Sequence, residues 1–337
     1  MKRDFLTIAD WSGKELLQIL DLSKEIKAHP KKFTRSLEGR SVALIFEKQS
    51  LRTHVTFEIG IKQLGANTVY LTNADISLGK RESIYDVAKN LERWVDAVVI
   101  RTFAQENVIS LAKFAKANVI NALTDFEHPC QAVGDFLTIQ EHLGSFKGKK
   151  LAWVGDGNNV CHSLMLLAAK VGMDFTAITP AGLAPAANVI ALAKEIAAST
   201  NSRIEISTIP LEGVRDADVV YTDVWVSMGQ ETDRDSKTKA FSGFQVNAKL
   251  MKNAKPTAVF MHCLPAHRGE EVTDEVMDSQ QSIVFDEAEN RLHTQKAILY
   301  TLLKGQSSEK LNTSGGRRKL VNSRGTTRNR SRATRKR

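Results

Sequence analysis

Residues 41–58 read SVALIFEKQSLRTHVTFE, and the rest of the chain repeats the structural unit that this stretch encodes. Residues 41–46 form a short apolar run bounded by polar residues, which is typical of a buried strand. A polar turn follows, and apolar residues recur from Val55 onward at helical spacing. The stretch therefore predicts a strand, a turn and the start of a helix.

The turn between this strand and helix carries groups that suit an anion. Ser50 and Thr53 offer hydroxyl donors, and Arg52 offers a planar guanidinium that matches phosphate oxygens. Free backbone N–H groups at the helix start add to the attraction. The alternative is an N-capped surface helix with a solvated arginine. The stretch by itself favours a phosphate site only slightly.

The alternation of strand and helix continues along the chain. The further apolar runs predicted as strands are residues 67–72, 96–101, 118–121, 150–154, 173–179, 203–208, 217–222, 257–261 and 282–285. This pattern predicts an α/β fold with two doubly wound domains, each a parallel sheet flanked by helices. Ligands of such sheets bind beyond the carboxyl ends of the strands, where Arg101, His128 and Gln131 fall.

A chain of 337 residues is long enough for two domains. The polar stretch 144–149 marks the predicted boundary, which gives domains at 1–145 and 146–286 and a last helix at 287–305 that joins the first domain. Residues 225–246 are polar and aperiodic, and a loop of that length is usually functional or mobile.

The net charge of +9 is concentrated at one end of the chain. Residues 311–337 contain ten Lys and Arg and no Asp or Glu, so residues 1–310 carry a net charge of −1. We expect residues 306–337 to form a disordered basic tail. The tail could bind nucleic acid, but a solvated tail without a dedicated partner is the favoured interpretation.

Composition also limits which cellular compartment and which cofactors are expected. No apolar run approaches the roughly 18 residues of a membrane helix, and no secretory signal is visible. Cys130, Cys161 and Cys263 are odd in number and far apart, so they indicate neither a disulfide framework nor a zinc site. We therefore expect a cytoplasmic protein without membrane contact, metal or cofactor.

Three later motifs follow predicted strands, and each has a structural alternative. Residues 155–159 read GDGNN, but Val160 stands where a nicotinamide-binding loop needs a third glycine, and Asn159 could simply cap a helix. Asp223 could bind an amine or cap its loop. In residues 262–265, HCLP, the cysteine and histidine are more often packed core residues than catalytic groups.

The joint order of the motifs is more specific than any one of them. Ser-x-Arg-Thr, a strand-terminal arginine, His-Pro-x-Gln, Gly-Asp-Gly-Asn-Asn, Asp-x-x-x-Ser-Met-Gly and His-Cys-Leu-Pro occur in that sequence. Together they resemble the carbamoyltransferases, and the last two resemble the ornithine carbamoyltransferases. The resemblance runs from about Phe5 to Leu303 and excludes the basic tail.

This resemblance implies an enzyme of arginine metabolism that carbamoylates ornithine, or another amine such as putrescine, without a cofactor. It implies a homotrimer, or a multiple of trimers, whose last helix packs back on the first domain. Arg101, His128 and Cys263 would be catalytic. The residues implied to bind carbamoyl phosphate are Ser50, Leu51, Arg52, Thr53, Arg101, His128, Gln131, Cys263, Leu264 and Arg291. The residues implied to bind ornithine are Asn159, Asp223, Ser227 and Met228.

Two positions depart from the pattern of the family that the chain resembles. His54 stands where Ser-x-Arg-Thr is usually followed by arginine, and Ser77 stands where glutamine or histidine is usual. Both departures bear on the affinity for carbamoyl phosphate rather than on the type of reaction.

Overall fold

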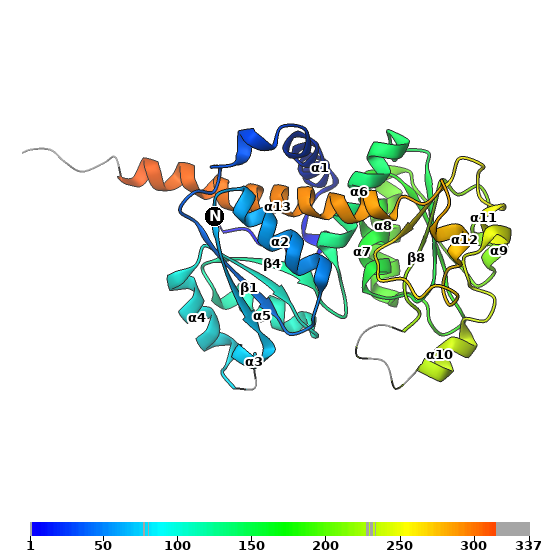
Figure 1. The fold of residues 1–337 in the computed structure, drawn as a ribbon, viewed down its shortest axis with the longest axis horizontal. Helices are drawn as coiled ribbons and strands as arrows, with labels where there is room; N and C mark the ends of the chain where they lie inside the picture. The colour runs from blue at the N-terminus through cyan, green and yellow to red at the C-terminus, as the bar shows by residue number, and fades with distance from the viewer. Residues whose placement is uncertain are drawn as a thin grey trace, which may run out of the picture.

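The computed structural model describes residues 2–76, 78–79, 81–226, 229, 232 and 234–314, with the backbone alone for 305–314. Two parallel sheets flanked by helices lie side by side (Figure 1), which confirms the predicted α/β class. The four-stranded sheet has the order β2-β1-β3-β4, and the five-stranded sheet has the order β7-β6-β5-β8-β9. No helix in the described part of the chain has the length and apolarity needed to span a bilayer.

The strands of the first sheet are β1 (Ser41–Phe46), β2 (Asn67–Thr72), β3 (Ala97–Arg101) and β4 (Asn118–Leu123). Alternate residues of β1 face two different apolar clusters: Val42 and Leu44 face one, and Ala43 and Ile45 face the other. Both faces of the sheet are therefore covered, which explains the continuous apolar run in the sequence. Phe46 is in register with Arg101, so the turn after β1 and the end of β3 lie at the same edge.

Helices cover the two faces of this sheet. The helices of the first half, with the last helix, that contribute to the cluster with Val42 are α1 (Gly13–Ala28), α2 (Leu51–Gln63), α6 (Pro129–Leu143) and α13 (Val284–Ser314). The helices on the other face are α4 (Ile84–Trp94) and α5 (Gln105–Phe114). Short helical turns complete the half: η1 (Ile8–Asp10), η2 (Pro30–Phe33) and α3 (Asn73–Ile76).

The second sheet is arranged in the same way. Its strands are β5 (Lys150–Val154), β6 (Asp174–Ile178), β7 (Ile204–Ser207), β8 (Val219–Thr222) and β9 (Val259–His262). The longer helices α7 (Asn159–Val171) and α8 (Ala187–Thr200) pack on one face. The shorter helices of this half are α9 (Pro210–Gly213), α10 (Arg234–Ala240), α11 (Ala248–Met251) and α12 (Asp274–Met277).

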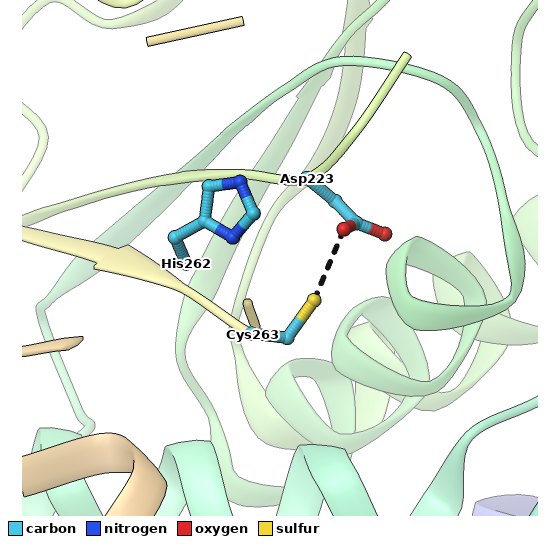
Figure 2. A group of neighbouring side chains, drawn as sticks. All are labelled: Asp223, His262 and Cys263. Atoms are coloured by element: carbon cyan, nitrogen blue, oxygen red, sulfur yellow. Dashed lines mark hydrogen bonds between the residues drawn. The ribbon is translucent and has the colours of Figure 1, made fainter. Parts of the chain in front are cut away.

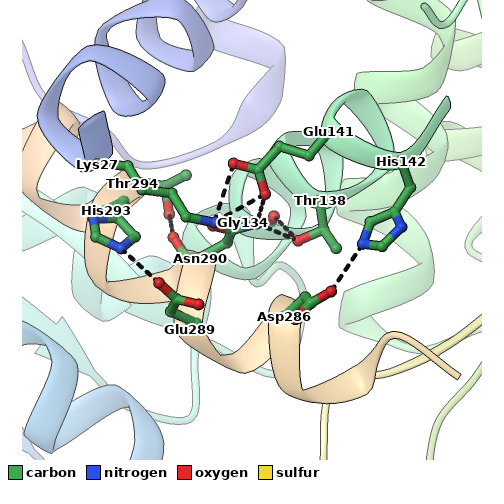
Figure 3. Close-up of polar contacts among 10 residues, drawn as sticks. All are labelled: Lys27, Gly134, Thr138, Glu141, His142, Asp286, Glu289, Asn290, His293 and Thr294. Atoms are coloured by element: carbon green, nitrogen blue, oxygen red, sulfur yellow. Dashed lines mark hydrogen bonds and ion pairs between the residues drawn. The ribbon is translucent and has the colours of Figure 1, made fainter. Parts of the chain in front are cut away.

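Helix α13 starts beside the second sheet and packs along the first half, as predicted (Figure 1). Figure 3 shows the polar contacts that attach it to α6 and α1. The Asn290 amide donates to Thr138 Oγ1 at 2.9 Å and to Glu141 Oε2 at 2.7 Å, and it accepts from Lys27 Nζ at 2.8 Å. These contacts fix the helix in register against two neighbouring helices.

Two predicted element boundaries differ from the structure. Residues 282–285 do not form a strand: Ser282 makes one isolated bridge to Phe260, and α13 begins at Val284. Helix α13 also runs to Ser314, so residues 306–314, which the sequence assigned to a disordered tail, are helical. The rest of that predicted tail, residues 315–337, lies outside the described residues. The predicted long loop at 225–246 contains α10.

Candidate active site

The start of α2 combines a helix cap with the groups expected to bind an anion. Ser50 is the N-cap, and its hydroxyl accepts the Thr53 N–H at 3.2 Å. Thr53 is buried, whereas Leu51 is 73% exposed. Burial lowers the pKa of the half-buried Arg52. The cap therefore does not exclude an anion site, because the remaining N–H groups and the guanidinium lie at the same helix end.

Two further guanidinium groups are buried near Arg52. Arg101 ends β3, and Arg291 lies on α13, where it donates to Gln131 Oε1 and, at 3.1 Å, to Thr53 Oγ1. Burial, followed by the charge of Arg291, lowers the pKa of Arg101 to about 10, so the group stays charged at neutral pH. The Nε groups of Arg101 and Arg291 are buried without a partner among the described residues. Such a concentration of buried positive charge and unused donors suits a ligand with several negative oxygens.

His128 lies beside this cationic group, between β4 and α6. Its backbone N–H donates to Ser163 Oγ at 3.0 Å, and its ring Nδ1 is buried without a partner in the described part of the chain. Burial, followed by the charges of Arg291 and Arg101, lowers the pKa of His128 well below its ordinary value. The imidazole is therefore neutral at pH 7, and it can donate a hydrogen bond without adding another positive charge.

The second half presents a carboxylate, an amide and a thiol. Asp223 follows β8, and its carboxylate accepts from Asn158 Nδ2 at 2.9 Å. It also accepts from Cys263 Sγ at 3.1 Å (Figure 2). Burial, followed by the charge of Asp223, raises the pKa of the Cys263 thiol well above its usual value. Cys263 is therefore a neutral donor rather than a thiolate nucleophile.

The cap of α7 is Asn158, because its side chain accepts the N–H groups of Val160 and Cys161. The alternative interpretation of Asn159 as the helix cap was therefore wrong. The Asn159 amide instead donates to Thr124 O, across to the first half, at 2.6 Å. This leaves Asn159 at the junction between the two halves.

Asp223, His262 and Cys263 offer ligand-type atoms within 4.8 Å of one another (Figure 2). Protein hydrogen bonds already engage these atoms. His262 Nδ1 accepts the Leu264 N–H at 2.9 Å, so its Nε2 carries the proton and donates to Glu271 Oε1 at 3.1 Å. His262 is fully buried, in agreement with its interpretation as a packed and satisfied histidine. The same bond holds the backbone of Leu264 in a left-handed conformation with φ 58°.

The two sets of residues lie together at one junction. The charge of Asp223 acts on Arg52, and Asn159 of the second half donates to Thr124 O of the first half, so the acidic side and the basic side are neighbours. The predicted site residues at this junction are Ser50, Leu51, Arg52, Thr53, Arg101, His128, Gln131, Asn159, Asp223, Cys263, Leu264 and Arg291. Ser227 and Met228 lie outside the described residues, as does Ser77.

Sequence reasoning missed three buried polar residues beneath this site, namely Asp135, Tyr221 and Glu287. Asp135 lies one helical turn after Gln131, and Glu287 lies one turn before Arg291. Residues four apart on a helix share a face, so this spacing was the signal that could have found two of them. Tyr221 sits in an apolar strand and carried no such signal.

Three guanidinium groups and a neighbouring carboxylate lie at the ends of two parallel sheets, which is where enzymes of the α/β class bind their substrates. Residues 3–141 match the family model described as aspartate/ornithine carbamoyltransferase, carbamoyl-P binding domain, and residues 147–302 match the Asp/Orn binding domain of the same family. The chain belongs to the aspartate/ornithine carbamoyltransferase family.

Relatives over nearly the whole length agree with this assignment. An ornithine carbamoyltransferase of Carboxydothermus hydrogenoformans is 50% identical over 303 residues, which cover 89% of this chain and 97% of that protein. The solved ornithine carbamoyltransferase of Pyrococcus furiosus superposes with a TM-score of 0.87 at 48% identity, covering 90% of this chain and 97% of that one. The solved ornithine transcarbamoylase of Giardia lamblia gives 0.83 at 35% identity, covering 90% and 98%.

Proposed function

We propose that this chain transfers the carbamoyl group of carbamoyl phosphate to the δ-amine of L-ornithine, giving L-citrulline and phosphate. The observation that carries the proposal is the convergence of three guanidinium groups and a neutral histidine opposite the carboxylate of Asp223. Family membership and relatives named ornithine carbamoyltransferase support the same reaction. They favour ornithine over another amine such as putrescine.

The anion site would hold carbamoyl phosphate. Its phosphate oxygens would be bound by Ser50, the Leu51 backbone, Arg52 and Thr53 at the start of α2. Arg101 would bridge the phosphate and the carbamoyl oxygen. The buried and unpartnered donors of this region support such a role. A dianion at this position offsets the repulsion among the guanidinium groups, which is a reason for tight binding.

The reaction forms a bond between the ornithine nitrogen and the carbamoyl carbon and breaks the bond from that carbon to the phosphate oxygen. The amine loses a proton overall, and phosphate leaves with the electron pair. Negative charge develops on the carbamoyl oxygen, where Arg101, His128 and Thr53 would stabilise it. Gln131 would orient the carbamoyl amide. The protein thus contributes positioning and charge stabilisation rather than a covalent intermediate.

The second half would hold ornithine. The Asp223 carboxylate is the partner proposed for the α-ammonium group, together with Asn159, Ser227 and Met228. Cys263 and the Leu264 backbone would lie beside the attacking δ-amine and the carbamoyl group. The neutral state of the Cys263 thiol supports this arrangement, because a thiolate next to Asp223 would add a second negative charge.

The proposal predicts citrulline formation from carbamoyl phosphate and ornithine. Purified protein should show a kcat/KM for ornithine at least about 100-fold above that for putrescine or N-acetylornithine, because only ornithine offers a free α-ammonium and an α-carboxylate together with a free δ-amine. Colorimetric citrulline measurement and phosphate release should agree in stoichiometry. A preference for putrescine would contradict the roles given to Asp223 and Asn159, and the absence of any ureido product would reject the reaction.

We further propose a cytoplasmic homotrimer, or a multiple of trimers. Exposed apolar side chains on α2 and the edge strand β2 support an assembly that buries them: Leu51, Val55, Ile59, Val69 and Tyr70. An edge strand with an apolar face is otherwise a liability in water. All three cysteines are free, which agrees with a reducing compartment.

A further inference from the structure

A cluster of buried polar side chains lies beneath the candidate site and joins the two halves of the molecule. Its members are Gln131 and Asp135 on α6, Glu287 on α13 and Tyr221 on β8; this group is called the carboxyl cluster below. All four are at most 1% exposed. Two carboxyl groups without an adjacent lysine partner are costly to bury, so their arrangement calls for a physical reason.

The two carboxyl groups fix the amide of Gln131. Gln131 Nε2 donates to Asp135 Oδ1 at 2.7 Å and to Glu287 Oε1 at 3.2 Å. Both amide protons are thereby used, so the amide plane cannot rotate without losing a bond. Its oxygen is turned toward Arg291, which donates to it. The residue proposed to orient the carbamoyl amide is therefore held by the carboxyl cluster.

The geometry around Tyr221 requires a proton on one of the carboxyl groups. The tyrosine hydroxyl lies 2.9 Å from Glu287 Oε1 and 3.2 Å from Asp135 Oδ2. A hydroxyl has one proton and can donate only once. A proton carried by a carboxyl group completes the second bond, with the tyrosine oxygen as its acceptor. Two carboxylates in one dry site cannot both ionise cheaply, which gives the same result.

Burial and mutual repulsion keep one proton on the carboxyl pair. Burial raises the pKa of both carboxyl groups, and the charge of Asp135 raises that of Glu287 further. The Gln131 amide and the Arg291 guanidinium oppose the rise for Asp135. Burial and the two carboxyl groups also raise the pKa of Tyr221 well above its usual value, so the hydroxyl keeps its proton.

The same glutamate reaches the strand that carries Cys263. Glu287 Oε2 accepts the backbone N–H of His262 at 3.0 Å, and His262 is the last residue of β9. The remaining titratable groups on this side are the His262 ring, which is tied to Glu271, and the Cys263 thiol, which donates to Asp223. One side chain thus connects the residues proposed to contact each substrate.

We propose that Asp135 and Glu287 share one proton and act as positioning residues, which hold Gln131 and the strand end before Cys263 in fixed relation across the two halves. This inference rests on the carbamoyl transfer proposed above. The shared proton keeps the anion site and the amine site aligned. Loss of this proton should therefore reduce catalysis under conditions in which the protein is still folded.

Neutral variants separate the two carboxyl groups. Glu287→Gln should lower kcat/KM for carbamoyl phosphate about three- to tenfold at pH 7. Its amide can donate to Tyr221 and its oxygen can accept the His262 N–H, but the amide that replaces Oε1 loses the bond from Gln131 Nε2. Asp135→Ala should lose about tenfold or more, because Gln131 Nε2 would lose its acceptor at 2.7 Å. Glu289→Gln, the same exchange on the same helix at an exposed residue that pairs with His293, is the matched control (Figure 3).

The pH profile gives a readout that a merely structural role would not move. Raising the pH removes the shared proton in wild type but not in Glu287→Gln, so the ratio of kcat/KM, variant over wild type, should rise between pH 7 and 9.5. The thermal midpoint of wild type should fall over the same range relative to Glu287→Gln, since carboxyl groups with raised pKa lose their stabilising contribution as pH rises.

A flat ratio with pH, or an Asp135→Ala enzyme as active as wild type, would overturn the inference. If wild type and Glu289→Gln both form no citrulline, the proposed reaction fails instead. In that case the thermal midpoints of wild type and Glu287→Gln still test the shared proton: parallel pH dependence would reject it.

Discussion

His54 lies within the Ser-x-Arg-Thr motif region but packs against aromatic side chains of the first half. Its ring stacks on Tyr70 with the centroids 3.9 Å apart and the planes at 15°, and Phe46 packs beside both rings. Its Nε2 lies 3.1 Å from the Glu58 carboxylate, one turn along α2. These contacts join α2 to the edge strand β2. The structure therefore favours a structural role for His54 over a role in the phosphate field.

We predict that His54→Ala lowers the free energy of unfolding by about 0.5–1.5 kcal/mol through loss of the aromatic pair. The apparent constant for carbamoyl phosphate should stay unchanged in His54→Ala and in His54→Arg. Urea unfolding and initial-rate assays measure the two quantities. His267→Ala, at a more exposed histidine of the second half, is the control. A lower carbamoyl-phosphate constant in His54→Arg would show that the missing arginine limits binding.

At the residue scale, the sequence was sufficient where a side chain stands at a strand end or helix start. Arg52, Arg101, His128 and Asp223 could be placed together because parallel strands present their carboxyl ends at one edge. Tyr221 could not, because its role depends on the register between α6 and β8. That register is set by packing across the whole core, and no local pattern records it.

Helix α13 depends on close approach to α6 at Gly134. A Cβ added there would lie 2.9 Å from Arg291 Cδ and 3.6 Å from Thr294 Oγ1. Arg291 is buried and donates to Gln131 and Thr53. Any side chain at position 134 must therefore displace either the helix or the guanidinium.

We predict that Gly134→Ala raises the apparent constant for carbamoyl phosphate by about tenfold or more and lowers stability by about 1–3 kcal/mol, the usual cost of overpacking. Gly60→Ala is the matched control, because its Cβ would meet the flexible Lys296 side chain of the same helix at 3.1 Å. This control should change stability alone. Equal effects of both variants on the substrate constant would contradict a specific role for the Gly134–Arg291 contact.

At the element scale, the strands were predictable from short apolar runs, and Ser12 and Glu15 form a capping box at the start of α1. Residues 282–285 were not, because four apolar or small residues fit a strand and a helix start equally well. Helix α13 extends to Ser314 although its last part is polar, which periodicity alone would end earlier. The sequence therefore predicted which helices and strands exist better than it predicted the residues at which they begin and end.

At the scale of the molecule, the excess of positive charge lies in a segment of the sequence that contains none of the candidate site residues. All ten positive charges of residues 311–337 lie after Ser314. We predict that a chain ending at Ser314 keeps its citrulline-forming activity within about twofold and elutes at the mass of a trimer or a multiple of it, since the proposed assembly surface lies on α2 and β2. Light scattering and the citrulline assay measure both. Loss of assembly on truncation would assign the interface to the removed residues, and retention of nucleic acid by the full chain alone would give the tail a partner.

Helix α13 packs against α1 and α2 although it ends the described chain. Its residues Ile298, Leu299 and Leu302 belong to the same apolar cluster as Leu16 and Phe57. Helix α13, which covers part of the first sheet, is therefore translated after the whole second half. While the second half is being synthesised, the apolar residues of the first half that pack against α13 stay exposed to water, and they become buried only when α13 emerges.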